Sequence, residues 1–291
     1  MSDAKTTITL ATATPGGGFP LYGGVVAEVV NATDPSLNVE CRNTKGSTEN
    51  VPLLEAGSVD LGLVTGEVAI EPFGRKSGLT IAAAMYSTAG MFVVRGDSPA
   101  RTIGDLKGKP VAFGARGSGL VILARYVLDG IGLDMERDFT AIYLDRAGDG
   151  PDMVLDGRAA ALWGGGVGWP GFARVAGEGG RFIAPDAGGI ARIRAKHAFL
   201  KPLTVPAGSY PGQSAAIASV GSWAFILARP GWPDDTGYRF ARALHDGAGK
   251  LSEKLEQAKE TTAANTGAAA PEPGLIHPGV ARYLREIGAL A

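Results

Sequence analysis

The sequence predicts an α/β protein built of two lobes, and three observations lead to that fold class. Strand-like and helix-like stretches alternate along most of the 291-residue chain before its last third. The expected strands are short and almost continuously apolar, as in parallel sheets that helices cover on both faces. A scheme of strand, glycine-rich turn, helix and strand occurs twice, which predicts two lobes that face each other across a cleft.

The composition fits a packed protein and excludes several function classes. Hydrophobic residues make up 45% of the chain, yet no apolar run approaches the ~20 residues that span a bilayer. The 28 basic and 29 acidic residues nearly cancel, so no overall field attracts nucleic acid. The single cysteine, Cys41, excludes an intramolecular disulfide, and its alternation with Leu37 and Val39 predicts a small core residue. No cofactor and no metal site are expected.

The first strand, turn and helix suggest an anion site. Residues 7–10 alternate polar and apolar side chains, as a half-buried strand does. Gly16-Gly17-Gly18 permits positive φ angles and a close approach of the backbone to a ligand. The N-terminus of the following helix offers unpaired N–H groups, which suit a carboxylate or phosphate near Gly17. The apolar face expected for that helix consists of Leu21, Val25, Val26, Val29 and Val30.

The other elements follow from the same periodicities and from their end signals. Pro52 is tolerated only in a first helical turn, so its helix begins near residues 47–50 and ends at Gly57. Another helix ends at Asp129-Gly130. Strands are expected at residues 37–42, 59–64, 81–86, 91–95, 110–114, 140–144, 160–163 and 222–229, and helices at 48–56, 120–128, 151–155, 234–246, 251–262 and 278–290.

Polar residues in the first cycle are candidates for ligand contacts. Ser47 and Asn50 lie between a strand and a helix, where they either cap the helix or hydrogen-bond into the cleft. Capping explains Ser47 by default, whereas asparagine is a mediocre helix former and Asn50 needs another reason. Thr65 and Glu67 follow the next strand at its carboxyl end.

The second glycine-rich turn adds a charged candidate. Arg116 and Ser118 stand in the turn Arg116-Gly117-Ser118-Gly119, where they can offer a guanidinium fork and a hydroxyl to a carboxylate. An exposed surface arginine is the alternative. The aromatic residues near the turns belong either to the core or to the apolar wall of a ligand site: Phe19, Tyr22, Tyr86, Trp163 and Tyr210.

Catalytic arrangements are poorly supported. The three histidines, His197, His245 and His277, stand in no nucleophile elbow and in no HExxH motif. Asp145 and Asp149 flank Arg146 and are interpreted as solvated turn residues.

Five stretches, in order along the chain, resemble the TAXI family of solute receptors, which serve tripartite ATP-independent periplasmic (TRAP) transporters. They are LATATPGGGFPLYGGVVAEV, TKGSTENVPLLEAGSVDLGLVTGEVA, TIGDLKGKPVAFGARGSG, VPAGSYPGQ and IHPGVARYLREIG. The chain departs from the family pattern at Gly18-Phe19-Pro20, at Thr65-Gly66-Glu67 and at Ser87-Thr88-Ala89.

This resemblance implies a type II periplasmic-binding-protein fold, with two α/β lobes joined by hinge strands around a central cleft. We expect residues 1–93 and 213–291 to form lobe 1 and residues 94–212 to form lobe 2. The implied protein is a periplasmic monomer whose signal peptide is absent from this chain. It binds a small organic anion, such as glutamate, and delivers it to a TRAP-type membrane permease. The expected ligand contacts are Gly17, Gly18, Phe19, Tyr22, Ser47, Asn50, Thr65, Glu67, Tyr86, Arg116, Gly117, Ser118, Gly119, Trp163 and Tyr210.

Two other functions remain open at this point. One is an enzyme on the same architecture that uses Arg116 and Asp149 on a carboxylated substrate. The other is a receptor that passes its ligand signal to a sensor kinase. A binding protein is favoured over the enzyme because the sequence supplies polar groups for a cleft but no positioned acid–base pair. The choice between transport and sensing stays open.

Overall fold

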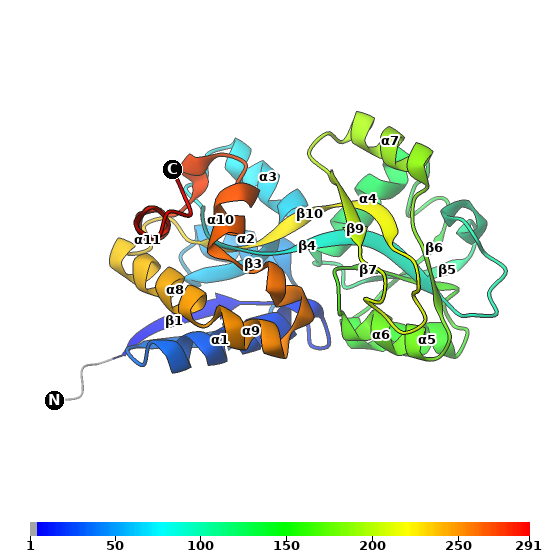
Figure 1. The fold of residues 1–291 in the computed structure, drawn as a ribbon. Helices are drawn as coiled ribbons and strands as arrows, with labels where there is room; N and C mark the ends of the chain where they lie inside the picture. Colours follow the sequence, from blue (N-terminus) through cyan, green and yellow to red (C-terminus); the bar gives the residue numbers. More distant parts are fainter. Residues whose placement is uncertain (1–4) are drawn as a thin grey trace. The chain divides into compact units, whose positions relative to one another are not determined.

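A computed structural model describes residues 5–291 and divides into two compact units (Figure 1). Unit 1 comprises the chain up to Ala13, Phe19–Tyr86 and Trp223–Ala291, and unit 2 comprises Thr14–Gly18 and Ser87–Ser222. The boundaries between the long segments thus follow Tyr86 and Ser222. The boundaries expected from the sequence follow residues 93 and 212.

Two continuous strands explain this difference. β4 (Thr80–Val94) and β10 (Ile217–Ala228) each run from one unit into the other. The two strands expected at residues 81–86 and 91–95 are therefore a single strand, and that expectation was wrong. Gly90 does not end β4, because its missing side chain makes room for a neighbouring ring: a Cβ there would lie 2.5 Å from Trp163 Cη2.

Unit 1 contains a mixed sheet with the order β2-β1-β3-β10-β4. β1 (Thr6–Ala11) pairs in parallel with β2 (Leu37–Arg42) and with β3 (Leu61–Thr65). β10 pairs with β3 in the antiparallel direction, with Phe225 opposite Val64. The parallel part matches the βα alternation of the sequence, and the antiparallel strand is the one that returns from unit 2.

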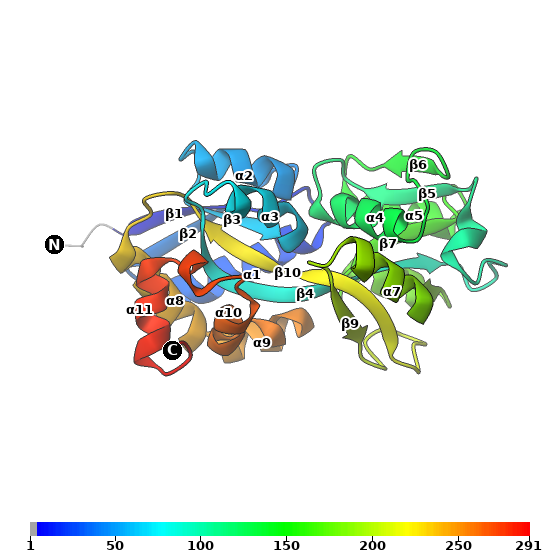
Figure 2. The ribbon, with the colours of Figure 1, turned by 90° about the horizontal axis from the view of Figure 1, so that it is seen from above.

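Helices cover both faces of this sheet (Figure 2). One face packs on α1 (Gly18–Thr33), α8 (Asp234–Asp246), α9 (Ala248–Lys254) and α11 (Pro278–Glu286). The other face packs on α2 (Ser47–Glu55) and α3 (Gly66–Gly74). The remaining helical segments of this unit are the 3₁₀ turns Glu256–Glu260 and Pro273–Leu275 and the helix α10 (Ala263–Ala269).

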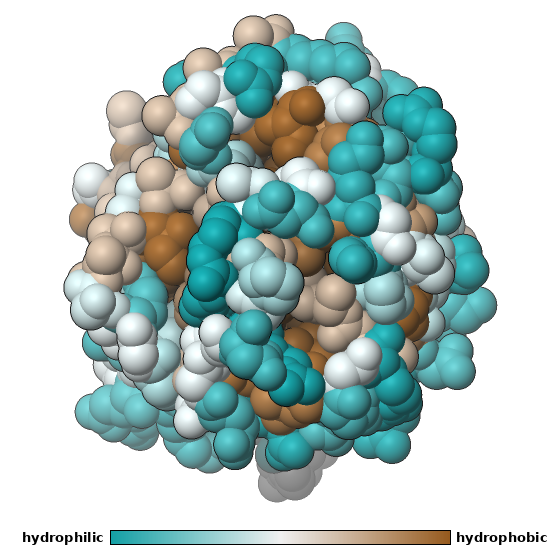
Figure 3. All heavy atoms as spheres, turned by 90° about the vertical axis from the view of Figure 1, so that its right-hand side faces the viewer, coloured by the Kyte–Doolittle hydropathy of each residue, from teal (hydrophilic) through white to brown (hydrophobic). Residues whose placement is uncertain are grey.

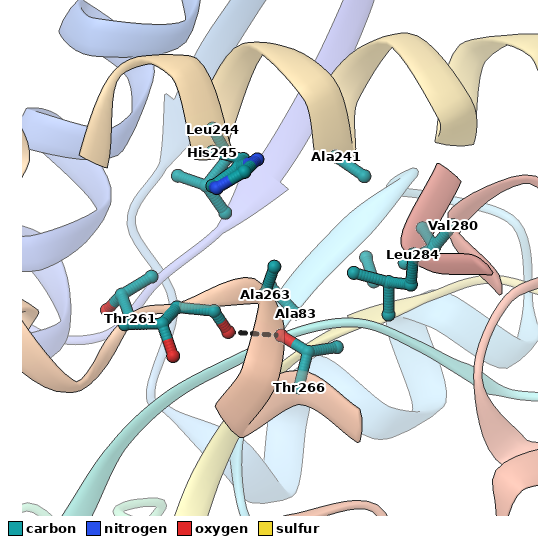
Figure 4. Close-up of a pocket in the computed structure, with 11 residues that line it drawn as sticks. Ala83, Ala241, Leu244, His245, Thr261, Ala263, Thr266, Val280 and Leu284 are labelled. Atoms are coloured by element: carbon teal, nitrogen blue, oxygen red, sulfur yellow. Dashed lines mark hydrogen bonds between the residues drawn. The ribbon is translucent and has the colours of Figure 1, made fainter. Parts of the chain in front are cut away.

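Threonine hydroxyls bind the outer edge of β4 in unit 1. Thr266 Oγ1 accepts a hydrogen bond from Ala84 N at 3.1 Å, and Thr261 Oγ1 donates to Met85 O at 2.8 Å. Thr266 also donates to Thr262 O, beside a small pocket between β4 and helices α8, α10 and α11 (Figure 4). The C-terminal segment thus satisfies backbone groups that a neighbouring strand would otherwise pair.

Unit 2 repeats the mixed arrangement with the order β4-β7-β5-β6. β5 (Pro110–Gly114) is parallel to β6 (Thr140–Tyr143) and to β7 (Ala161–Gly165), and β4 is antiparallel to β7. Two short strands complete the unit: β8 (Arg181–Ile183) pairs with β4, and β9 (Lys201–Val205) pairs with β10.

Helices also cover both faces of the unit 2 sheet. One face packs on α4 (Gly119–Gly130) and α7 (Ala187–Lys196), and the other packs on α5 (Gly150–Leu155) and α6 (Pro170–Gly177). The 3₁₀ turns Ile103–Leu106 and Ala147–Asp149 lie in its loops. Figure 3 shows hydrophilic and hydrophobic residues interspersed over one face of the molecule. In the described part of the chain, every helix is too short or too polar to cross a membrane.

Three local predictions were wrong. Leu21 is 41% exposed and Tyr22 is buried instead, whereas Val26, Val29 and Val30 on the expected face of α1 are buried as predicted. Cys41 is exposed rather than in the core, because it lies near the end of the edge strand β2, beyond the buried Val39. The helix expected at residues 251–262 is broken into α9 and a 3₁₀ turn.

Candidate functional site

In unit 1, the expected ligand residues gather where β1 and β3 end and α2 and α3 begin. Asn50, on α2, is fully buried. Its Nδ2 donates to the backbone oxygens of Thr12 and Leu63, both at 2.8 Å, and its Oδ1 accepts from Thr44 Oγ1 at 2.7 Å. Both polar atoms of the amide are therefore engaged inside unit 1, and Asn50 holds the two strand ends together.

Ser47 does not cap α2, which corrects the default explanation. The cap position belongs to Gly46, whose φ of 113° suits glycine, and Ser47 is the first helical residue. The buried Ser47 Oγ accepts a hydrogen bond from Thr65 N at 3.2 Å. This contact ties the start of α2 to the end of β3.

Thr65 and Glu67 lie at the start of α3. Thr65 occupies the cap position, and its side chain makes no capping hydrogen bond. Its hydroxyl is buried and has no hydrogen-bond partner in the part of the chain that the structure describes. A buried polar group in that state costs free energy, which a bound ligand would recover. Glu67, in the first turn of α3, is 5% exposed and adds a carboxyl group to the same place.

Tyr22 and Tyr86 stack edge to face in unit 1, with ring centroids 5.3 Å apart. The Tyr22 hydroxyl bonds to Thr261 Oγ1 at 2.9 Å, and Thr261 donates in turn to Met85 O. Burial raises the pKa of both phenols well above the usual value, so both are neutral. Phe19 is half-buried against the same core. These rings pack in the core of unit 1. A core position was one of the two alternatives that the sequence left open for the aromatic residues.

The first glycine-rich turn belongs to unit 2, although residues on both sides of it belong to unit 1. Gly17 N donates to Thr14 O at 3.2 Å, so this N–H is used inside the turn. Gly18 begins α1. Gly16, with a φ of 80°, lies against Gly148, and a Cβ on Gly16 would be 2.7 Å from Gly148 Cα. The turn therefore needs glycine for a close approach between two backbone segments.

The second glycine-rich turn presents an arginine beside a helix N-terminus. Arg116 is exposed, and its guanidinium carbon lies 3.9 Å from the centroid of the Tyr143 ring. Among the described residues it makes no salt bridge and no side-chain hydrogen bond, so its N–H donors are available to a ligand. Ser118 caps α4 by accepting from Leu120 N at 3.2 Å. Gly117 and Gly119 complete the turn, and Gly119 is the first residue of α4.

Tyr143 is a residue that the sequence interpretation missed. It ends β6, and its hydroxyl bonds to Glu136 and accepts from Arg125 Nη2 at 2.9 Å. Burial and the bond to Glu136 raise the pKa of this phenol. An aromatic residue at the carboxyl end of a predicted strand was the available signal, but only the fold brings it to Arg116.

Trp163 and Tyr210 lie in the core of unit 2. Trp163 is 1% exposed and its Nε1 donates to Leu120 O at 2.7 Å. The Tyr210 hydroxyl bonds to Gly166 O and accepts from Trp169 N at 3.3 Å. The indole and phenol groups are thus used within the unit.

The remaining titratable groups provide little for catalysis. His245 bonds to Tyr283, His277 to the Trp232 carbonyl and His197 to Asp129. Asp145 and Asp149 line an open pocket of unit 2 together with Tyr143 and Asp152. Within the described residues, no three His, Cys, Asp or Glu side chains are placed to hold a metal ion.

Solved structures show what the fold is similar to. A protein described as a periplasmic transporter aligns at 16% identity over 98% of this chain and 94% of its own, with a TM-score of 0.59. The substrate-binding protein of an amino acid ABC transporter aligns at 14% identity over 87% and 97%, with a TM-score of 0.51. The alkanesulfonate-binding protein of Xanthomonas axonopodis pv. citri, bound to MOPS, aligns at 18% identity over 98% and 84%, with a TM-score of 0.50.

These similarities confirm the predicted fold class, a mixed α/β fold like that of periplasmic binding proteins. A comparison of the sequence with models of protein families identifies the family as well as the fold. The model of the NMT1-like family matches residues 10–288, which is nearly the whole chain. The chain therefore belongs to the NMT1-like family.

Proposed function

We propose that this protein is an extracytoplasmic solute-binding protein that captures a small organic anion and delivers it to a membrane permease of the TRAP type. The fold class supports a binding role, because proteins that share it include an amino acid and an alkanesulfonate receptor. Binding requires fixed polar groups and no positioned acid–base pair.

The observation that carries the proposal is the state of Arg116. Its exposed guanidinium makes no ion pair among the described residues, and it stands beside the N-terminus of the 12-residue helix α4. A helix N-terminus and a guanidinium both favour negative charge. A carboxylate is therefore the ligand group we assign to this turn.

Unit 1 has polar groups of its own that suit a ligand. The Thr65 hydroxyl, which has no partner among the described residues, and the buried Glu67 carboxyl group both lie at the start of α3. They suit a hydrogen-bond donor such as the ammonium group of an amino acid like glutamate, which a simple dicarboxylate lacks. The other predicted contacts, among them Gly18, Phe19 and Tyr86, stay predictions.

Delivery to an ABC-type importer is the second candidate, since one similar structure is the receptor of such a transporter. The TRAP assignment rests on the five motifs and their order along the chain. Reconstituting transport with a permease of each type decides between the two. Uptake that depends on an ABC importer would contradict the TRAP proposal and leave the binding function intact.

Binding itself is tested with the purified protein. Native mass spectrometry first identifies any retained ligand, and calorimetry then compares L-glutamate, succinate, methanesulfonate and glucose. We expect the anions to bind and glucose to give no heat. Binding of glucose alone would refute the anion proposal, and chemical turnover of a bound anion would favour an enzyme.

The matched variants are Arg116→Lys and, as the control, Arg194→Lys on the exposed side of α7. A charge-assisted hydrogen bond contributes roughly 1.5–3 kcal/mol, so Arg116→Lys should weaken anion binding about tenfold to a hundredfold. The control should bind as the wild type does. Equal affinities in all three proteins would remove Arg116 from the site.

A further inference from the structure

The Arg116 guanidinium lies over the aromatic ring of Tyr143, although Arg116 is an exposed residue in a turn. Its central carbon lies 3.9 Å from the centroid of the Tyr143 ring, well inside the distance of about 6 Å for a cation–π contact. An arginine in such a turn ordinarily samples many rotamers, because its long side chain has several free torsions. Contact with a fixed ring removes much of that freedom.

The Tyr143 ring is itself fixed from its other end. Its hydroxyl bonds to Glu136 Oε1 and accepts from Arg125 Nη2 at 2.9 Å, while Arg125 and Glu136 form an ion pair at 2.9 Å. Met135 Sδ lies 3.5 Å from the same hydroxyl. Residues from α4 and from the loop before β6 therefore hold the phenol, and its open face carries Arg116.

We propose that Tyr143 is a positioning residue that holds the Arg116 guanidinium in one orientation before any ligand arrives. The consequence for ligand binding rests on the proposed function of Arg116 as the hold on an anion. The ring lies against the guanidinium carbon, and the N–H donors of the group, which make no side-chain hydrogen bond among the described residues, remain available. A carboxylate that approaches in the guanidinium plane then meets two donors that are already aligned.

Removing the Tyr143 ring should weaken ligand binding, although the ring itself makes no contact with the ligand. Ordering a mobile side chain on binding costs about 0.5–1.5 kcal/mol, which corresponds to a loss of about two- to tenfold in affinity. Tyr143→Leu removes the aromatic face, whereas Tyr143→Phe keeps the face and removes the hydroxyl anchor. We therefore expect the larger effect from Tyr143→Leu.

The first experiment needs no ligand. Nuclear magnetic resonance of the arginine Nε–Hε groups measures the mobility of each side chain, with Arg116→Lys used to assign the Arg116 signal. We expect a restrained, ring-shifted Arg116 signal in the wild type and in Tyr143→Phe, and a mobile one in Tyr143→Leu. Arg194 is the mobile reference. An Arg116 signal as mobile as that of Arg194 in the wild type would overturn the proposal, even if Tyr143→Leu failed to fold.

The second experiment separates positioning from binding. Calorimetry with L-glutamate compares Tyr143→Leu in the wild-type and in the Arg116→Lys background. A loss of about two- to tenfold in the first and none in the second supports the coupling. Equal losses in both backgrounds would overturn it, because Tyr143 would then act independently of Arg116. Restrained mobility of Arg116 with unchanged affinity in every variant supports the positioning and refutes the proposed function of Arg116.

Discussion

Asn50 joins three parts of unit 1 through a single side-chain amide. It bonds to the backbone at the ends of β1 and β3 and to Thr44, in the segment before α2. These carbonyl groups need this partner because they lie just past the β1–β3 ladder, which ends at Ala11 and Gly62. The surface that carries Ser47 and Thr65 therefore depends on a residue that offers no free polar atom of its own.

Replacing this amide should cost stability even without a ligand. Asn50→Ala removes the donor to the Leu63 carbonyl and leaves the Thr12 carbonyl and the Thr44 hydroxyl with only their mutual 3.2 Å contact and the bond from Gly46 N to Thr44, so we expect a loss of about 1–3 kcal/mol in the free energy of unfolding. Urea denaturation measures it. The control is Asn38→Ala, whose amide bonds only to Glu40 at the surface and should change stability by less than ~0.5 kcal/mol. Equal denaturation midpoints in the two variants would contradict the role of Asn50.

The sequence indicated that the polar segment around Asn50 belongs to the candidate site. It did not indicate the hydrogen-bond partners of Asn50. Those partners are carbonyl groups of two strands, and their approach depends on the register of the sheet rather than on neighbouring residues. Arg116 and Ser118 were proposed as site residues because a glycine-rich turn before a helix is a local pattern. Tyr143 was not, because its contact with Arg116 joins the end of β6 to the turn before α4, which are distant in the sequence. The core positions of Trp163 and Tyr210 were left open for the same reason.

At the scale of elements, His277 fixes the start of α11 against the start of α8. Its ring is 3% exposed, and its Nε2 donates to Trp232 O at 2.9 Å. The ring lies on the backbone of α8, where a Cβ on Gly237 would be 2.4 Å from Nδ1. Nδ1 has no hydrogen-bond partner among the described residues. A proton added to Nδ1 would therefore find no hydrogen-bond acceptor among the described residues.

This geometry predicts a dependence of stability on pH. Burial lowers the pKa of His277 below its usual value near 6.5, against smaller opposing effects of the Trp232 carbonyl and of Asp234, 3.8 Å away. In the unfolded chain the ring binds a proton more readily, so stability is lost as the pH falls from about 6.5 through the folded-state pKa. Above pH 6.5 this group contributes no slope.

Two measurements check this expectation. The histidine C2-proton shifts should give a titration midpoint for His277 below 6.5 in the folded protein. Urea denaturation at pH 7.5 and at pH 5.5 should show a loss of stability that is smaller in His277→Gln than in the wild type. A midpoint of 6.5 or higher would show that the ring is not penalised by burial.

The element boundaries illustrate what periodicity can predict. β5 and α8 lie where their patterns placed them, because each has a clear apolar face and a clear end signal. α3, which contains Pro72, has no counterpart among the expected helices. β4 was expected as two strands, whereas it continues through Gly90, which accommodates the Trp163 ring.

At the scale of the whole molecule, the chain passes between the units at four points, after Ala13, Gly18, Tyr86 and Ser222. The first two bracket the short segment Thr14–Gly18, which joins unit 2 through the contact of Gly16 with Gly148. The sequence predicted two lobes from its repeated scheme. It could not place the boundaries, because a continuous strand carries no local signal where it leaves one unit.

The Gly16 contact can be separated from the strain of its backbone angle. Gly16 and Gly132 have φ angles of 80° and 81°, but a Cβ on Gly132 would meet nothing within 4 Å. An alanine at either position costs about 1–2 kcal/mol for the left-handed conformation. Gly16→Ala should cost more, because its Cβ also meets the Gly148 backbone at 2.7 Å.

Urea denaturation compares the two variants, and hydrogen exchange reports on the loop around Gly148. We expect faster exchange there in Gly16→Ala and wild-type exchange in Gly132→Ala. Identical stability and exchange in the two variants would show that the approach of Gly16 to Gly148 has no energetic role.

The position of β10 in the unit 1 sheet constrains how the chain is made as well as how it folds. Residues 87–222 of unit 2 leave the ribosome as one stretch, whereas β10 inserts between β3 and β4, which were synthesised long before it. Synthesis at about 5–20 residues per second leaves the facing edges of those two strands unpaired for several seconds. Unpaired edges associate readily with other strands. The C-terminal segment that starts with β10 thus completes unit 1, and a chain released before it would expose both edges to aggregation.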